Sequence, residues 1–268
     1  MAERSSGEWS SGEAYERYVG RWSRRVAAAF VEGTVVPPGA RWVDVGCGTG
    51  ALTSAVLAAA DPGLVVGIDA AEPFVAHARA TVGDPRAAFA AGDAQALPVR
   101  SNGFDAAVSG LALNFVPDPP RAVAEWARAV KPGGVVAAYV WDYAEGMELM
   151  RWFWDAAAVL DPAVAELDEG RRFPLCHPDP LSRLWQRAGL TGVVVRAIGV
   201  RTAFAGFDDY WLPFLGGQGP APGYAVQLPE EHRRALRDLL HARLPIAADG
   251  TITLTARAWA VRGSVPHR

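Results

Sequence analysis

Three glycines stand at alternate positions in the stretch Arg-Trp-Val-Asp-Val-Gly-Cys-Gly-Thr-Gly, residues 41–50. The apolar residues before them predict a short buried strand, and the helix-forming residues 51–60 predict a helix directly after them. This order of strand, glycine loop and helix exposes backbone N–H groups to a ligand at the N-terminus of the helix. Because Gly46, Gly48 and Gly50 lack a Cβ atom, a ligand can lie directly against the backbone.

Acidic residues near this loop narrow the choice of ligand. The pattern Gly46-x-Gly48-x-x-Ala51, with an acid at Asp69, fits a dinucleotide site and equally another adenosyl ligand. Asp44 precedes the first glycine by two residues, where it can face a cationic amino group. Asp93 follows a third predicted strand, where it suits an adenine amino group. A ligand that is part nucleoside and part amino acid would use all these acids.

The motifs together resemble those of the class I S-adenosylmethionine-dependent methyltransferases, in particular the branch similar to ubiquinone/menaquinone C-methyltransferases. The matching segments follow one another in order and spacing: 43–50, 67–69, 92–98, 104–105 and 131–134. The tight part of the resemblance covers residues 40–142. It implies S-adenosylmethionine as methyl donor and S-adenosylhomocysteine as product, and it leaves the acceptor open because this branch methylates many small molecules.

The resemblance implies a role for each position of the loop. Gly46, Gly48 and Gly50 would let it lie against the methionine part of the donor. Asp44 would lie near the donor's ammonium group. Cys47 would be a small member of the same loop and not a nucleophile.

The ends of the next strands would hold the nucleoside. Asp69 would accept hydrogen bonds from both ribose hydroxyls, and Ala70 would touch the adenine face. Asp93 would bind the adenine amino group beside the Ala94 backbone. Leu111, just past the fourth strand, would line the methyl-donor pocket with its carbonyl.

Aromatic residues suggest what surrounds the donor and the acceptor. Tyr15, Tyr18 and Trp22 belong to an aromatic, basic N-terminal helix that either closes over the glycine loop or packs on the sheet edge. A second set can form the acceptor pocket, or can be ordinary packing: Phe115, Trp141, Tyr143, Tyr210 and Trp211. Aromatic faces would also favour the positive sulfonium of the donor.

Methyl transfer is an in-line displacement that depends mainly on positioning, which alone can supply about 7–11 kcal/mol. If the acceptor must also lose a proton, a general base is needed at the carboxyl ends of the strands. Asp142, directly after the fifth strand, is the first candidate. His177, in a segment able to fold over the pocket, is the second.

Alternating apolar strands and helices predict an α/β fold, a Rossmann-like doubly wound seven-stranded sheet, mostly parallel with one reversed strand, plus a helical and aromatic cap. The predicted strands follow the one at 41–45 and lie at 63–69, 86–91, 103–109, 135–141, 191–203 and 250–261. The predicted helices besides 51–60 lie at 13–31 with a break near Gly20, and at 72–82, 119–130, 145–170, 180–188 and 229–243. Residues 131–134 predict a turn.

These elements predict a single methyltransferase domain over residues 1–268. Its core would comprise about 35–142, 180–203 and 250–262, and its cap would comprise 9–32, 143–179 and 204–245.

Composition limits the other functions open to this chain. Its 26 basic and 29 acidic residues give a net charge of −3, which argues against nucleic-acid binding. Two cysteines are too few for a disulfide framework or a four-thiolate metal site, so no metal is expected. There is no long apolar run and no signal-like N-terminus, so we expect a cytoplasmic protein that acts on a small molecule, without a membrane partner.

Two other functions stay open at this point, and so does the oligomeric state. An NAD(P)-dependent oxidoreductase would need a hydride-transfer set that is not recognisable here. A non-catalytic S-adenosylmethionine-binding protein would bind the donor without room for an acceptor. A nucleic-acid methyltransferase is disfavoured because no Asn/Asp-Pro-Pro-Tyr/Phe motif follows the fourth strand.

Overall fold

Short apolar segments in the first half of the chain form parallel strands. The computed structural model describes residues 16–217 and 219–267. The parallel strands are β1 (Arg41–Val45), β2 (Leu64–Asp69), β3 (Ala87–Ala91), β4 (Phe104–Gly110) and β5 (Val130–Trp141). Most apolar residues of β1, β4 and β5 are buried because helices cover both faces, whereas the edge strand β3 buries only Phe89.

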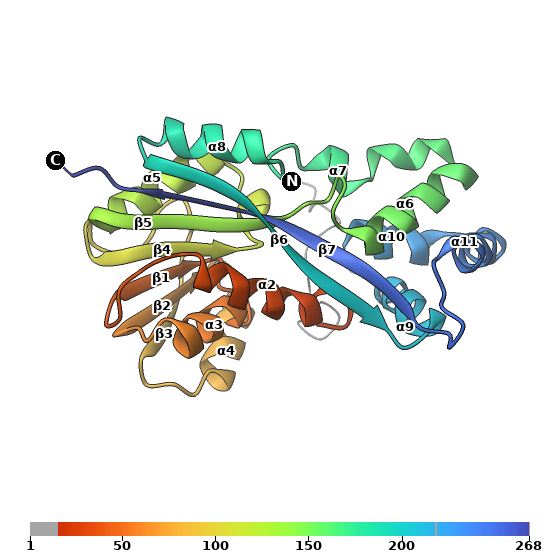
Figure 1. Cartoon of the computed structure of the whole chain (residues 1–268), viewed down its shortest axis with the longest axis horizontal. Coiled ribbons are helices and arrows are strands. Elements are labelled where there is room, and N and C mark those ends of the chain that lie inside the picture. Colours follow the sequence, from red (N-terminus) through yellow and green to blue (C-terminus); the bar gives the residue numbers. More distant parts are fainter. Residues whose placement is uncertain (1–15, 218, 268) are drawn as a thin grey trace. The chain divides into compact units, whose positions relative to one another are not determined.

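Two later strands complete a seven-stranded sheet of order β3-β2-β1-β4-β5-β7-β6. These are β6 (Thr191–Phe204) and β7 (Ile252–Ser264), and β7 runs antiparallel to β5 from Val135↔Ser264 to Trp141↔Ala258. The predicted Rossmann-like sheet with one reversed strand is therefore confirmed. Figure 1 shows the long β6 and β7 beside the shorter parallel strands.

One expected turn is part of a strand. Residues 131–134 lie within β5, where Val130 pairs with Phe104 before the register shifts and resumes at Ala106↔Val135. The extra residues are accommodated by Gly133, whose φ is +79°. The turn signal thus marks an irregularity in the strand.

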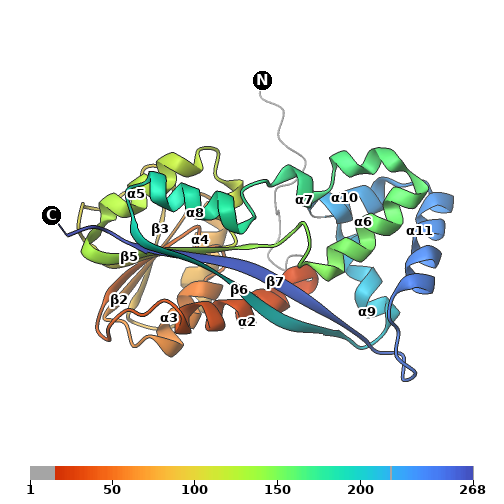
Figure 2. The ribbon, with the colours of Figure 1, turned by 45° about the horizontal axis from the view of Figure 1, so that its top comes forward.

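Helices of the sheet region pack through large apolar side chains. On one face, α5 (Pro119–Ala129) lies beside α8 (Pro178–Arg187), with the rings of Trp126 and Trp185 6.4 Å apart (Figures 1 and 2). The Trp185 indole donates a hydrogen bond to the Val136 carbonyl, 2.9 Å away, which fixes α8 on β5. The remaining helices of this region are α2 (Arg21–Glu32), α3 (Ala51–Ala59), α4 (Glu72–Thr81) and the turn η2 (Leu113–Phe115).

The described residues divide into two compact units. The sheet unit holds Ser23–Trp141, Leu175–Ile198 and the described residues from Ala258 on. The helical unit holds the described residues up to Trp22, together with Asp142–Pro174 and Gly199–Arg257. The division into a core and a cap of one domain stays a prediction.

The helical unit is built from short helices around an aromatic core. Its helices are η1 (Glu16–Gly20), α6 (Glu148–Leu160), η3 (Pro162–Glu166), α7 (Glu169–Arg172), α9 (Phe207–Trp211), η4 (Leu212–Gly216), α10 (Pro220–Gln227) and α11 (Glu230–Arg243). In its core Phe153 stacks on Phe214, with ring centroids 4.5 Å apart. The single helix expected over 145–170 is divided because Asp161 caps a new turn that starts at Pro162.

No helix in the described ranges is long and apolar enough to cross a membrane.

The break expected near Gly20 is present, since the π-helical turn η1 ends there and α2 begins at the next residue.

Candidate functional site

The glycine loop adopts a backbone shape that side chains would oppose. Gly46, Gly48 and Gly50 have φ angles of +71°, +51° and +90°. A Cβ atom on Gly46 would lie only 2.4 Å from the Cβ atom of Ala112. The loop is tied to β2, since the Gly46 N–H donates to the Ile68 carbonyl at 2.7 Å. The loop is therefore held closely between the ends of β2 and β4.

Asp69 ends β2 and helps to hold this loop in place. One carboxylate oxygen accepts the Gly48 N–H at 2.9 Å, and the other accepts the Ala71 N–H at 2.8 Å. Each oxygen keeps a second lone pair for a ligand hydroxyl. The structure thus brings Asp69 and the loop together, next to the exposed Ala70.

Asp44 is fully buried on β1 and only partly satisfied. One oxygen accepts the Thr53 hydroxyl at 2.7 Å, while Oδ1 is buried without a hydrogen-bond partner in the described part of the chain. Burial raises the pKa of Asp44 to about 7; the charge of Asp69 adds to this, and the Thr53 hydrogen bond opposes it. A buried carboxylate oxygen without a partner fits a cationic group, as the donor's ammonium would require.

The side chain of Cys47 points away from this chemistry. It packs in an apolar cluster with Val75, Ala78 and Phe89. Burial raises the pKa of its thiol far above the ordinary range. The sulfur is thus part of the core, and only the backbone of Cys47 is available to a ligand.

Asp93 and Ala94 follow β3 on a tightly hydrogen-bonded segment. The Asp93 carboxylate is exposed and accepts the Gln95 backbone N–H at 2.8 Å. The Ala94 carbonyl accepts the Trp126 indole at 3.0 Å, which fixes the segment on α5. These residues lie after the strand that neighbours Asp69.

The end of β4 and the segment after it combine Leu111, which was predicted to line the donor pocket, with buried polar groups that had no predicted role. Leu111 has a φ of +59°, which is strained for a residue with a side chain, and its N–H donates to the Tyr139 carbonyl at 2.8 Å. In the described chain the Ser109 hydroxyl and both amide atoms of Asn114 are buried without partners. The signal for Asn114 was a polar residue in an otherwise apolar run.

The remaining candidates of the sheet unit differ in exposure. Trp141 is buried, whereas Phe115 is 49% exposed. His177 is half-buried at the N-cap of α8, and its side chain makes no capping hydrogen bond.

Asp142 lies in the helical unit, where other groups already bind its carboxylate. One oxygen accepts the Arg257 guanidinium at 2.6 Å, and the other accepts the Glu145 N–H at 3.1 Å. Its side chain is 2% exposed. This geometry favours a structural role in the turn after β5, and the role of general base stays a prediction.

The other candidates of the helical unit are buried together. Tyr18, Trp22, Tyr143, Tyr210 and Trp211 are all buried. Tyr18 and Tyr210 both contact Phe214, with ring centroids 5.3 and 5.4 Å apart. Tyr15 lies outside the described residues. Glu169, which is buried in the same unit, was not among the predicted site residues.

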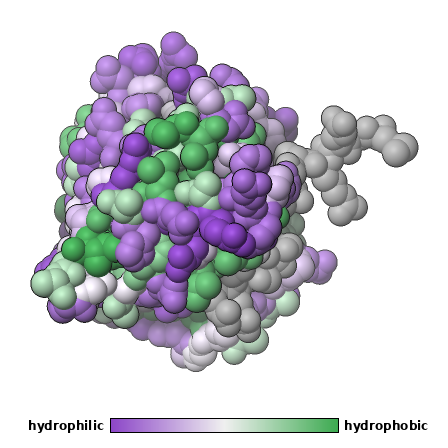
Figure 3. All heavy atoms as spheres, turned by 90° about the vertical axis from the view of Figure 1, so that its right-hand side faces the viewer, coloured by the Kyte–Doolittle hydropathy of each residue, from purple (hydrophilic) through white to green (hydrophobic). Residues whose placement is uncertain are grey.

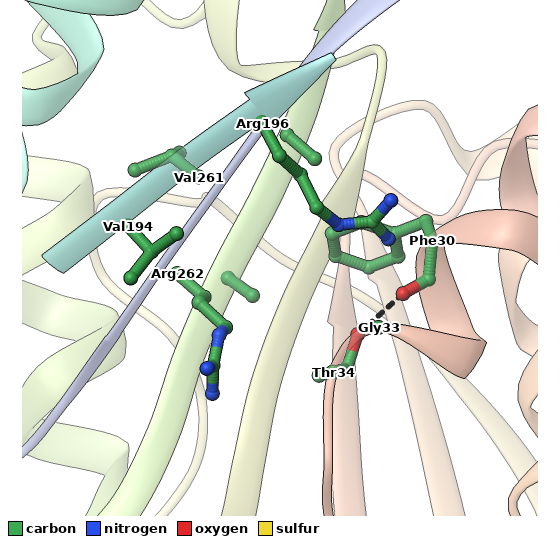
Figure 4. A pocket seen from close by; sticks show the side chains of 9 residues that line it. Phe30, Gly33, Thr34, Val194, Arg196, Val261 and Arg262 are labelled. Atoms are coloured by element: carbon green, nitrogen blue, oxygen red, sulfur yellow. Dashed lines mark hydrogen bonds between the residues drawn. The ribbon is translucent and has the colours of Figure 1, made fainter. Parts of the chain in front are cut away.

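Two cavities are lined by none of the residues expected at the carboxyl ends of the strands. A small one of about 20 Å³ is lined by residues that include Phe30, Thr34 and Arg196 (Figure 4). A groove of about 600 Å³ is lined by Trp211, Leu215, Val226 and charged residues of α11. Figure 3 shows the side that carries α11, where apolar and hydrophilic patches alternate. Only Trp211 belongs to the predicted site.

The carboxyl ends of four neighbouring strands thus carry one set of residues within the sheet unit. The glycine loop follows β1, Asp69 ends β2, Asp93 follows β3, and Leu111 follows β4. This edge of a doubly wound sheet is where such folds bind ligands. The individual roles of these residues stay predictions. Across the described residues, no group of three His, Cys, Asp or Glu side chains is placed to hold a metal ion.

Comparisons with known proteins agree with this arrangement. The methyltransferase domain family matches residues 43–138. Demethylmenaquinone methyltransferases of Roseiflexus castenholzii and Roseiflexus sp. strain RS-1 are 30% and 32% identical, over 62% of this chain and 74% of each relative. The structure of phosphoethanolamine N-methyltransferase 2 of Haemonchus contortus in complex with S-adenosyl-L-methionine has a TM-score of 0.60 at 18% identity. That likeness covers 95% of this chain and 56% of the other.

These relatives confirm the resemblance drawn from the motifs and support neither the oxidoreductase nor the non-catalytic alternative. The chain belongs to the class I S-adenosylmethionine-dependent methyltransferases, in the branch of the ubiquinone/menaquinone methyltransferases.

Proposed function

We propose that the chain transfers the methyl group of S-adenosylmethionine to a small-molecule acceptor, and that the donor binds at the carboxyl ends of β1 to β4. The proposed position of the donor depends on one observation: Oδ1 of Asp44 is buried and unpartnered beside the glycine loop, which Asp69 holds in place. An ammonium group satisfies the first carboxylate and a ribose the second. The relatives named for demethylmenaquinone support a small molecule as acceptor.

When bound, the donor supplies an activated methyl group on a positively charged sulfur. The chain's own residues then bind and orient the reactants. Asp44 holds the ammonium group, Asp69 the ribose and Asp93 the adenine, while the Leu111 carbonyl and the Asn114 amide border the methyl group. Such positioning can supply about 7–11 kcal/mol of the barrier reduction. Asp142 and His177 remain the candidates for a base, and the Arg257 ion pair makes Asp142 the less available.

Titration calorimetry of the full chain with S-adenosylmethionine and S-adenosylhomocysteine tests the donor site. We expect both to bind with one site per chain. A folded protein that binds neither would overturn the proposal.

The acceptor is found by incubating pooled metabolites with methyl-labelled donor and identifying the labelled product. We expect the label on a small molecule. Label transferred to protein or nucleic acid instead would contradict the acceptor class. The cytoplasmic location stays a prediction from the sequence.

A further inference from the structure

Glu169 is a buried carboxylate that the methyl-donor site does not use. It is the first residue of α7, and it is only 2% exposed. It accepts a hydrogen bond from the indole Nε1–H of Trp154 on α6, and its own backbone N–H is the other donor close to it. Both donors are neutral. Within the described residues, Glu169 has no ion pair.

The nearest cation is bound by a different acid. Arg151 lies three residues before Trp154 on α6, and its guanidinium donates to both carboxylate oxygens of Asp168, one of them at 2.8 Å. Asp168 also accepts the Gly170 N–H at 2.8 Å, which holds it at the start of α7. The charge of Arg151 is therefore neutralised by Asp168, and Glu169 has no counter-charge of its own.

Aromatic side chains lie close to this carboxylate. The phenol of Tyr18 interacts with Glu169, and those of Tyr143 and Tyr210 interact with Tyr18. The ring of Trp154 lies 5.2 Å from that of Phe153, and Tyr143 lies 5.4 Å from Phe173. Residues 143 and 144 press on the same helix, since a Cβ atom on Gly170 would lie 2.9 Å from the Cα of Ala144. Glu169 is thus an acidic group that contacts Trp154 and interacts with Tyr18, in a part of the helical unit rich in aromatic rings.

We propose that Glu169 is the anionic half of a binding site for an organic ammonium group, and that Trp154, Tyr18 and Tyr143 supply the aromatic half. A buried carboxylate is costly unless a cation pairs with it. Indole and phenol faces attract a desolvated organic cation in addition. A divalent metal fits less well, because it requires several oxygen ligands and only one carboxylate is offered. The site lies wholly within the helical unit.

The electrostatics of the cluster agree with this assignment. Burial, more than any other cause, raises the pKa of Glu169 to about 7; Asp168 adds to the shift, while the Trp154 hydrogen bond and Arg151 oppose it. The charged groups that act on Glu169 are therefore Arg151 and Asp168, and the titratable phenol that interacts with it is that of Tyr18, which in turn interacts with Tyr143 and Tyr210. Without a ligand, about half of the Glu169 side chains hold a proton at neutral pH, and an ammonium group would replace that proton.

The indole N–H resonance of Trp154 in an NMR spectrum of the full chain reports on this site. This resonance is assigned by its disappearance in the Trp154→Phe variant. Titration with propylammonium should move this resonance saturably, whereas 1-propanol of similar size should not. Binding should be about tenfold tighter at pH 8 than at pH 6, because the ionised fraction of Glu169 rises by about that factor. Equal binding of the alcohol, or no pH dependence, would overturn the proposal.

Variants separate the charge of Glu169 from its packing. Glu169→Gln should weaken propylammonium binding at least tenfold, and Glu169→Asp should restore part of it. Glu166→Gln is the matched control, since Glu166 lies three residues away with an exposed side chain and should bind propylammonium as the wild type does. Propylammonium that binds Glu169→Gln normally would contradict the assignment. The comparison of propylammonium with 1-propanol, and of pH 6 with pH 8, uses only the wild-type chain. It therefore decides the proposal even if the Glu169→Gln protein folds poorly.

Discussion

Asp44 combines full burial with an unpartnered oxygen, and this makes donor binding depend on pH. Its pKa of about 7 means that half of the free protein carries a proton there at neutral pH. An ammonium ligand needs the ionised form. The affinity for S-adenosylhomocysteine should therefore rise about 15-fold between pH 5.5 and 7, as measured by calorimetry.

Two variants test whether this rise of the affinity with pH, the slope of the pH profile, is caused by the titration of Asp44. Asp44→Asn should bind S-adenosylhomocysteine weakly and with no such slope. Asp105→Asn should keep the slope, because Asp105 lies at the opposite end of β4 in an ion pair with Lys131. A slope that persists in Asp44→Asn would assign the titration to another group.

Asp69 holds the glycine loop and, as we propose, the ribose. Asp69→Ala removes charge-assisted hydrogen bonds worth about 1.5–3 kcal/mol each, so the affinity for S-adenosylhomocysteine should fall at least 100-fold. Asp93→Ala should cost less, about tenfold, because its carboxylate is exposed and already pairs with Gln95. Unchanged affinity of Asp69→Ala in calorimetry would refute the ribose assignment.

Within the strand–loop–helix element, the effect of the glycine loop on binding can be separated from ordinary backbone strain. Gly46→Ala and Gly39→Ala both place a side chain at a positive φ, +71° and +75°. Only at Gly46 does the new Cβ meet another residue, Ala112. We expect both to lower the melting temperature by a few degrees, at about 1 kcal/mol of strain. Gly46→Ala alone should also weaken binding of S-adenosylhomocysteine. Equal binding by both variants would show that the loop tolerates a side chain.

The elements themselves could largely be predicted, because each depends on nearby residues. The break at Gly20, the start of α5 at Pro119 and the apolar strands are all visible in the local sequence. The division of the helix predicted over 145–170 also has a local signal, the pair Asp161-Pro162. The long apolar periodicity across this region outweighed that signal in the prediction.

The site could be predicted only where strand order places residues together. Asp44, Asp69 and Asp93 follow from the parallel sheet. The partner of Asp142 did not, since Arg257 lies 115 residues away on β7. Glu169 was missed for a similar reason. Its importance depends on burial by α6 and on Arg151 pairing with Asp168, and no local pattern reports either of these contacts.

At the scale of the whole molecule, Glu169 should make stability depend on pH. Its pKa is about 7 in the folded chain against 4.5 for an ordinary glutamate, so the folded state binds more protons. The protonated Glu169 contributes fully to the free energy of unfolding below pH 4.5. As the pH rises through 7, about 3 kcal/mol of this free energy is lost. Glu169→Gln should therefore gain stability relative to wild type at pH 8 and not at pH 4.5, measured by urea unfolding. A variant that loses the same stability at both values would show that the charge is compensated elsewhere.

The division into two units should be visible when the donor site is filled. Every donor-binding residue proposed at the strand ends lies in the sheet unit. A ligand that binds only the folded state at 100 times its dissociation constant adds about 2.7 kcal/mol of stability. Hydrogen exchange with S-adenosylhomocysteine should therefore slow at 46–50, 69–71, 93–97 and 110–114. The same addition to Asp69→Ala should leave these amides unprotected, which separates specific binding from a general effect of the nucleoside. Protection confined to the helical unit would place the donor elsewhere, because the glycine loop and its acids would then take no part in holding it.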